Sequence, residues 1–179
     1  MALRTPPSWL QNGSHPAEND RLTSQALWKT TGIVNSTDLA VTQSASPGMS
    51  VSVASGYGII VGTTTTNMGA YISFNDAAAT LTVTTANPSN PRIDIVVVQV
   101  SDAYYTGTLN AVSFSVIAGT PAVSPVAPTV PANSLLLATV AVGAAVTQIL
   151  NANITDNRTL TITPISTANI ETAVFMQAY

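Results

Sequence analysis

Apolar and polar residues alternate along much of the chain after residue 33. In residues 49–54 and 80–84 every second position is apolar, and residues 71–74 repeat the trend. Such alternation is typical of a β-strand with one buried face. Residues 93–100 are instead almost continuously apolar, which is typical of a strand buried on both faces. The pattern predicts a mainly β protein.

Glycine and proline mark the turns between these strands. Three glycines within residues 56–62 predict a tight hairpin. Residues 87–91 (NPSNP) predict a turn, because asparagine and proline both favour turn geometry. Residues 119–131 (GTPAVSPVAPTVP) predict an extended, polyproline-like connector.

Three further segments with apolar residues at strand-like spacing predict strands in the second half of the chain. These segments cover residues 112–117, 135–142 and 145–149. We expect the last two to pair with each other across a turn at Gly143. Residues 159–179 have room for one more strand and a segment that leaves the domain.

Only residues 16–29 carry a helical pattern. Pro16 suits the first turn of a helix, and Glu18 and Asp20 favour the positive end of the helix dipole. Apolar residues recur at helical spacing at Leu22, Ala26 and Leu27. The sequence therefore predicts one short helix.

The residues before this helix predict an extended arm. Residues 1–15 include Pro6 and Pro7, which remove backbone donors and push preceding residues into extended conformations. Trp9 and Leu10 are the apolar anchor of this arm, on its own domain or on a neighbouring subunit.

Short strands separated by frequent turns favour an antiparallel sandwich or barrel over a βαβ fold. We therefore expect a compact antiparallel β-sandwich or barrel-like domain with an extended N-terminal arm and one short helix. The predicted divisions are an arm and helix over residues 1–32, a β domain over 33–160 and an exit segment over 161–179.

Charge is scarce in this chain. Charged residues make up 7% of the sequence and hydrophobic residues 46%, against about 25% charged in typical soluble domains. Hydroxyl and amide side chains take the place of charges. Because charges are costly to desolvate, this composition favours a surface that contacts other subunits. The alternative is a threonine-rich β protein that does not assemble.

The composition also excludes several classes of partner. The net charge is −3 and the five Lys and Arg residues are scattered, so we expect no nucleic-acid partner. Cysteine is absent, which excludes disulfides and thiolate metal sites. No apolar stretch reaches the roughly 20 residues needed to span a bilayer. The first seven residues lack signal-peptide features, so we expect a soluble protein made in a cytoplasm, with no membrane partner.

The inventory of catalytic groups predicts no enzyme. The single histidine, His15, adjoins Ser14, and neighbouring residues cannot form a catalytic triad. The carboxylates considered for acid–base chemistry are Asp38, Asp76, Asp94, Asp102 and Asp156. Two of them lie two residues from an arginine, in the pairs Arg92–Asp94 and Asp156–Arg158. Side chains at this spacing share one face of a strand, so both pairs are expected to be structural ion pairs.

The sequence contains few residues or motifs that indicate a metal, cofactor or ligand site. Asn151, Asn153, Asp156 and Asn157 cluster, but they lack the spacing of a calcium loop, so no metal site is predicted. No phosphate-binding glycine motif is present, and no cofactor is expected. Tyr104 and Tyr105 form a possible contact surface for a glycan or a protein. The alternative is that the two rings pack over the edge of the domain.

The order of five segments resembles a domain of phage tail proteins. They are a Met-x-Val-x-Val-x-x-Gly strand, Asn-Pro-Arg-Ile-Asp, a Gly-Thr-Pro-Ala connector, a Leu-Ala-x-Val-x-Val strand and Ile-Thr-Asp-x-Arg, at residues 49–56, 90–94, 119–131, 137–142 and 154–158. Residues 16–22 (PAENDRL) also look like the start of minor tail proteins of actinobacterial phages. The resemblance covers about residues 16–160.

The resemblance implies a non-enzymatic virion protein of the tail tip or baseplate, similar to minor tail proteins and baseplate upper proteins. It implies other tail or baseplate proteins as partners, and a homo-oligomer, with a trimer as the first expectation. Longer relatives continue into a fibre or receptor-binding region, so recognition falls to a separate polypeptide or to this domain. The alternatives are a receptor- or glycan-binding module and a capsid decoration or head-fibre protein.

Overall fold

A computed structural model describes residues 16–106 and 108–161 of the chain. This part is mainly β, with ten strands in three antiparallel sheets and two α-helices. The sheets do not close into a barrel, so the domain is sandwich-like. The prediction of a mainly β, antiparallel, sandwich-like fold is confirmed.

The strands are short except for two long ones at the centre. The helices are α1 (Ala17–Leu27), α2 (Ala103–Thr106) and a 3-10 turn, η1 (Asn151–Asn153). The strands are β1 (Gly32–Ile33), β2 (Val41–Gln43), β3 (Ser50–Val53), β4 (Gly56–Val61), β5 (Ala70–Asn75), β6 (Ala79–Thr82), β7 (Arg92–Ser101), β8 (Ala111–Ile117), β9 (Ser134–Val142) and β10 (Ile154–Asp156).

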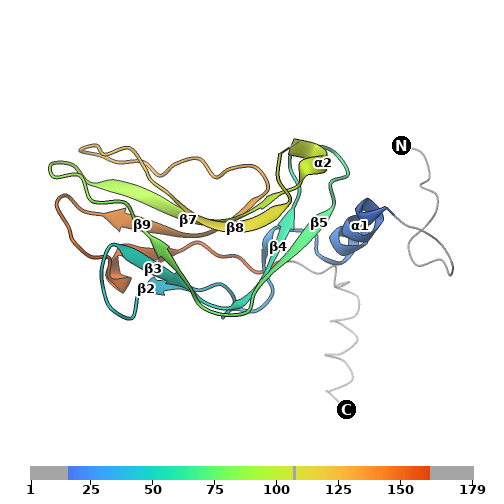
Figure 1. The fold of residues 1–179 in the computed structure, drawn as a ribbon, viewed down its shortest axis with the longest axis horizontal. Helices are drawn as coiled ribbons and strands as arrows, with labels where there is room; N and C mark the ends of the chain where they lie inside the picture. Colours follow the sequence, from blue (N-terminus) through green and yellow to red (C-terminus); the bar gives the residue numbers. More distant parts are fainter. Residues whose placement is uncertain (1–15, 107, 162–179) are drawn as a thin grey trace, which may run out of the picture.

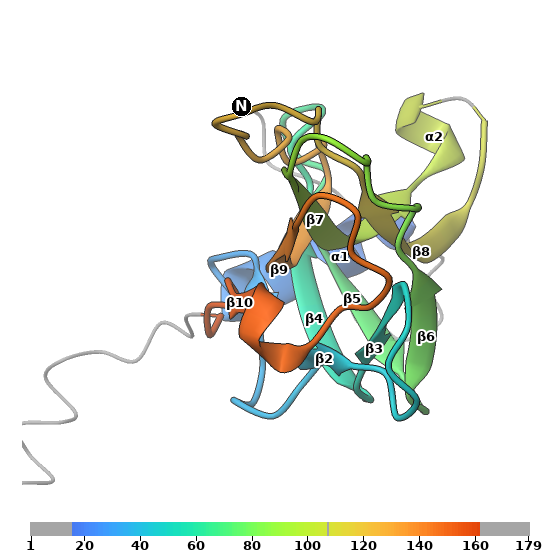
Figure 2. The same ribbon diagram turned by 90° about the vertical axis from the view of Figure 1, so that its left-hand side faces the viewer.

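The domain has two layers. One layer is a four-stranded sheet in the order β10-β9-β7-β8. The other consists of two three-stranded sheets, β2-β3-β6 and β1-β4-β5, which follow one another along the long axis (Figures 1 and 2). The chain passes from β3 to β4 through two residues, and this short link joins the two small sheets.

The core lies between these layers. Alternate residues of β3, Val51 and Val53, are fully buried, as the period of two requires. They meet Val96 and Val98 of β7 in one apolar cluster that also includes Leu137 of β9. The alternation seen in the sequence is thus the division between core and surface.

Strand β7 is buried on both faces. Val96 and Val98 face the shared core, while Ile95 and Val97 alternate with them and are also buried. Residues 118–133 run back along the outer side of this sheet (Figure 1). A bulge in the β7–β9 pairing skips Leu137, which is fully buried. The prediction of a doubly buried strand is confirmed.

The structure corrects the strand prediction for residues 145–149. These residues do not pair with β9; that edge is occupied by β10, which pairs antiparallel with it. The amide of Ile149 instead donates to the carbonyl of Gly48, and its side chain is fully buried. Ile149 therefore reaches the core from a loop, with Val146 packed partly against the same core.

The predicted tight hairpin is a longer one. Strands β4 and β5 do pair, but Val61 faces Ala70 across an eight-residue loop. Gly56 lies at the corner between β3 and β4, with a φ of 142° that suits glycine. A second helix, α2, was also not predicted; it is a single turn after β7.

Helix α1 packs against β5, close to the predicted position. At its start the carbonyl of Pro16 accepts from the amide of Asn19, and at its end the amide of Trp28 donates to the carbonyl of Ser24. The contact is close because Gly69, just before β5, has no side chain: a Cβ there would lie 2.5 Å from the carbonyl carbon of Arg21. The helix is therefore tightly attached to the β domain.

Candidate functional site

The first acid–arginine pair is buried within the domain. Arg92 Nε lies 2.8 Å from Asp94 Oδ1 and Arg92 Nη2 lies 3.2 Å from Asp94 Oδ2, and the two residues are 4% and 0% exposed. Arg92 also donates to the carbonyls of Thr84 and Thr85, at 2.6 and 2.9 Å. Asp94 accepts a further hydrogen bond from the amide of Gly119, at 2.9 Å. The pair thus joins β7 to two loops and has no access to a substrate.

The second pair lies at the surface. Arg158 donates from Nε and Nη2 to the two carboxylate oxygens of Asp156, at 2.9 and 2.7 Å. The Asp156 side chain is 58% exposed. Arg158 Nη1 donates to the carbonyl of Asp38, 120 residues away in the sequence. This pair therefore ties the end of β10 to the loop before β2.

The Asp156–Arg158 pair predicts how the stability of the protein changes with pH. Hydrogen bonds from Arg158 hold the pKa of Asp156 below its ordinary value of 3.8. A lowered pKa in the folded state gives stability that is present above the ordinary pKa and lost as the pH falls through the lowered one. Asp156→Asn should therefore be less stable than the parent at neutral pH, and the difference should shrink between about pH 5 and pH 2.

Urea unfolding at a series of pH values measures this difference. The matched control is Asp76→Asn, at an exposed aspartate for which no ion pair is seen with any residue in 16–106 or 108–161. Asp76→Asn should change the free energy of unfolding at neutral pH by no more than about 0.5 kcal/mol. A constant gap for Asp156→Asn across the acid range would contradict the prediction.

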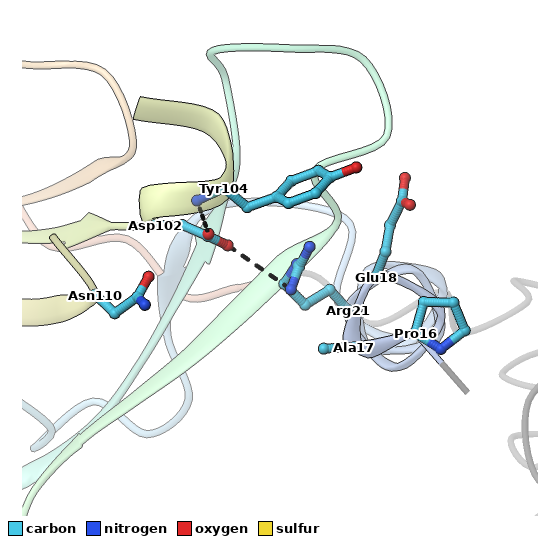
Figure 3. A pocket seen from close by; sticks show the side chains of 7 residues that line it. All are labelled: Pro16, Ala17, Glu18, Arg21, Asp102, Tyr104 and Asn110. Carbon is cyan, nitrogen blue, oxygen red and sulfur yellow. Dashed lines mark hydrogen bonds and ion pairs between the residues drawn. The ribbon is translucent and has the colours of Figure 1, made fainter. Parts of the chain in front are cut away.

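A polar pocket lies between α1 and the segment that carries α2. Its volume is about 330 Å³, and Figure 3 shows the side chains converging from the two sides. The lining residues are Pro16, Ala17, Glu18, Arg21, Asp102, Tyr104 and Asn110. A second hollow of about 420 Å³ continues from it past Tyr71 and the start of β8 and shares three of these residues. Together they form the candidate site.

Arg21 joins the walls of this site. Its Nε donates to the carbonyl of Met68 at 2.8 Å and its Nη2 to the hydroxyl of Tyr105 at 3.0 Å. The guanidinium carbon also lies 5.1 Å from the ring centre of Tyr71 and 5.5 Å from that of Tyr105, within cation–π range. One side chain of α1 therefore fixes the position of both β5 and α2.

Asp102 organises the opposite wall. Its Oδ2 accepts a hydrogen bond from the hydroxyl of Tyr71 at 2.8 Å and lies 3.7 Å from Arg21 Nη1. Its Oδ1 accepts from the amide of Tyr104 and so caps α2. Burial, and then the hydrogen bond to Asp102, raise the pKa of Tyr71 above its ordinary value. Tyr71 therefore stays a neutral donor to this carboxylate.

The two predicted contact tyrosines have different environments. Tyr104 is 83% exposed, while Tyr105 is half-buried and bonded to Arg21. The rings meet edge to face, with centroids 5.0 Å apart and an interplanar angle of 84°. Tyr105 is thus part of the structure that lines the site, and the ring of Tyr104 lies at the solvent-exposed opening of the pocket.

Other predicted residues lie apart from this pocket. Trp9, Leu10 and His15 lie outside the described residues. Asp38 accepts from the amide of Asn35, and Asp76 lines a different hollow. In the part of the chain that the structure describes, no three His, Cys, Asp or Glu side chains gather in a way that could hold a metal ion.

An exposed apolar patch covers part of the outer face of β4 and β5. Tyr57 and Phe74 face each other across the strand pair, with ring centroids 6.2 Å apart, and Ile72 lies beside them. All three are largely exposed, Phe74 at 71%. Contiguous exposed apolar groups of this kind are typical of contact surfaces.

Sequence reasoning missed most of the pocket. The sequence pattern places Arg21 among scattered cations and Tyr71 on a strand, and it gives no signal for Asn110. Asn110 Oδ1 accepts from the amide of Ala103, so it closes the α2 loop from the far side. The one available signal was the polar cluster around the two tyrosines.

Comparison with known proteins identifies no relative. No family model, curated protein or solved structure matches the chain. Within residues 16–106 and 108–161, no helix has both the length and the apolar character needed to cross a membrane.

Proposed function

We propose that the chain is a structural, non-enzymatic protein of a phage virion. Its place is the tail tip or baseplate, where it links the tail to the parts that recognise the host. The proposal begins from the five segments that resemble a tail-protein domain, and the contacts among these segments support it.

Four of the five segments contact one another through backbone pairs and hydrogen bonds. The segment at 49–56 shares the apolar core with the strand at 137–142, and each ion pair lies within one segment. Asp94 is paired with Val140 across β7 and β9, and accepts from Gly119 of the connector. Asn157 donates its amide to the carbonyl of Leu137. The segment at 49–56 is linked to the rest because the amide of Leu39 donates to Ser55 and the neighbouring Asp38 carbonyl accepts from Arg158.

This network is the observation that carries the proposal. The residues of the five segments connect strands and loops, and none of them lines the polar pocket, whereas Pro16, Ala17, Glu18 and Arg21 of the 16–22 motif do line it. A domain whose recognisable residues serve structural stability fits a connecting module better than an enzyme.

The surface supports assembly with other subunits. With 7% charged residues, the chain can bury surface at a low cost in desolvated charge. The patch of Tyr57, Ile72 and Phe74 gives the β4–β5 face an apolar surface suited to a second copy of the chain. We propose a homo-oligomer, with a trimer as the first expectation, beside other tail or baseplate proteins.

Deletion of residues 1–15 tests the assembly role of the arm that includes Trp9 and Leu10. Ordering an apolar arm on a neighbour buries surface worth roughly 25 cal/mol per Å². The truncated protein should fold but enter phage particles at strongly reduced occupancy. Western blotting of purified particles measures occupancy, with Trp9→Phe as the conservative control. Normal occupancy of the truncated protein would refute this role.

A receptor- or glycan-binding role is the second candidate. It is favoured by one observation, the exposed ring of Tyr104 at the mouth of a polar pocket. A capsid decoration or head-fibre role shares the same fold and low charge.

A further inference from the structure

The pocket between α1 and α2 combines a fixed aromatic ring with planar polar side chains. Tyr104 is exposed, yet its ring rests edge-on against Tyr105, whose hydroxyl accepts from Arg21. Exposed aromatic surface that is held in place costs little entropy when it binds a partner. The ring is therefore suited to stack on a ligand that occupies the pocket.

The polar rim offers both donors and acceptors. The Asn110 carbonyl oxygen accepts from the amide of Ala103, which fixes the orientation of its side chain. No hydrogen bond from its Nδ2 to any residue in 16–106 or 108–161 is seen, so this group can donate to a ligand. Arg21 has five N–H donors, uses Nε for Met68 and Nη2 for Tyr105, and faces Asp102 with Nη1. Glu18 adds carboxylate oxygens from the side of α1 (Figure 3).

The charged residues that line the pocket favour a neutral ligand over a charged one. The lining contains one cation, Arg21, and two carboxylates, Glu18 and Asp102, and all three already interact within the protein. Asp102 already faces Arg21 and the hydroxyl of Tyr71, so its charge is largely met within the protein. A neutral ligand rich in hydroxyl groups suits this balance better than an ion.

We propose that this pocket binds a neutral saccharide. The C–H face of a sugar ring would stack on Tyr104, and its hydroxyls would accept from Asn110 and Arg21. The volume of about 330 Å³ lies at the lower end of the range for ligand pockets, roughly 300–1,000 Å³, and suits a small glycan unit. The inference goes beyond the structural role and does not depend on it.

Titration of the purified full chain with defined sugars tests the proposal by NMR. The probes are maltotriose, mannotriose, galactotriose and triacetylchitotriose, with sialyllactose as an anionic comparison. At least one neutral probe should shift backbone amide signals confined to residues 17–21, 102–106 and 108–110. The isolated chain is used, so the outcome is separate from where the protein lies in a particle.

Two variants and a control locate the binding site. Tyr104→Ala should weaken binding about tenfold or more, because the stacking face is lost, and Asn110→Ala should weaken it as well. Val123→Ala shortens an exposed apolar side chain outside the pocket and should leave affinity unchanged. The proposal is overturned if no neutral probe shifts these signals, if only sialyllactose binds, or if Tyr104→Ala binds as tightly as the parent.

Discussion

Asp94→Ala is expected to lower the free energy of unfolding by roughly 3–5 kcal/mol, because it leaves the buried guanidinium of Arg92 without its carboxylate. The substitution also removes the acceptor for the Gly119 amide. A loss of this size is a large part of the roughly 5–15 kcal/mol that stabilises a typical domain.

Urea unfolding measures the loss, with Asp156→Ala as the matched control. That residue also pairs with an arginine but is exposed, so its loss should stay below about 1 kcal/mol. The double variant Arg92→Met/Asp94→Leu should lose less than Asp94→Ala, because it leaves no unpaired charge in the core. Equal losses for Asp94→Ala and Asp156→Ala would contradict a central role for the buried pair.

Gly69→Ala should lower the free energy of unfolding by roughly 2–4 kcal/mol and displace α1. Gly69 has a φ of 77°, which is unfavourable for alanine, and the added Cβ would meet the backbone of Arg21 at 2.5 Å. Because Arg21 joins α1 to Tyr105 and Asp102, the same change should open the polar pocket.

Hydrogen exchange of residues 17–27, alongside urea unfolding, checks both effects. Gly48→Ala is the control, because an added Cβ there meets no atom within 4 Å. It should change stability by no more than about 0.5 kcal/mol and leave exchange in α1 unchanged. Unaltered protection of α1 in Gly69→Ala would show that the close contact with β5 does not hold the helix.

Residue spacing, turn chemistry and helical periodicity correctly predicted those features that depend only on residues close together in the sequence. The spacing of Arg92 and Asp94 places both on one face of β7, and the structure joins them there. The Asn87 side chain accepts from the amides of Ser89 and Asn90, the turn chemistry that the NPSNP run predicts. Periodicity also predicted helix α1 to within two residues at its C-terminal end.

The sequence pattern does not predict which of two distant segments pairs with a given strand edge, or which distant side chains meet. Residues 145–149 have the composition of a strand, but β10 occupies the edge of β9 and Ile149 fills the core instead. The polar pocket depends on a hydrogen bond between Arg21 and Tyr105, 84 residues apart. Such a contact is fixed only when α1, β5 and the α2 loop are placed together.

The measurement that tests the central claim most directly is immunogold electron microscopy of intact phage particles with an antibody against this chain. The structural role at the tail tip predicts gold at the distal end of the tail. Gold over the head would contradict the tail assignment and favour a decoration protein. Absence of gold, with the epitope shown to be accessible on the purified chain and on disrupted particles, would contradict the virion assignment altogether.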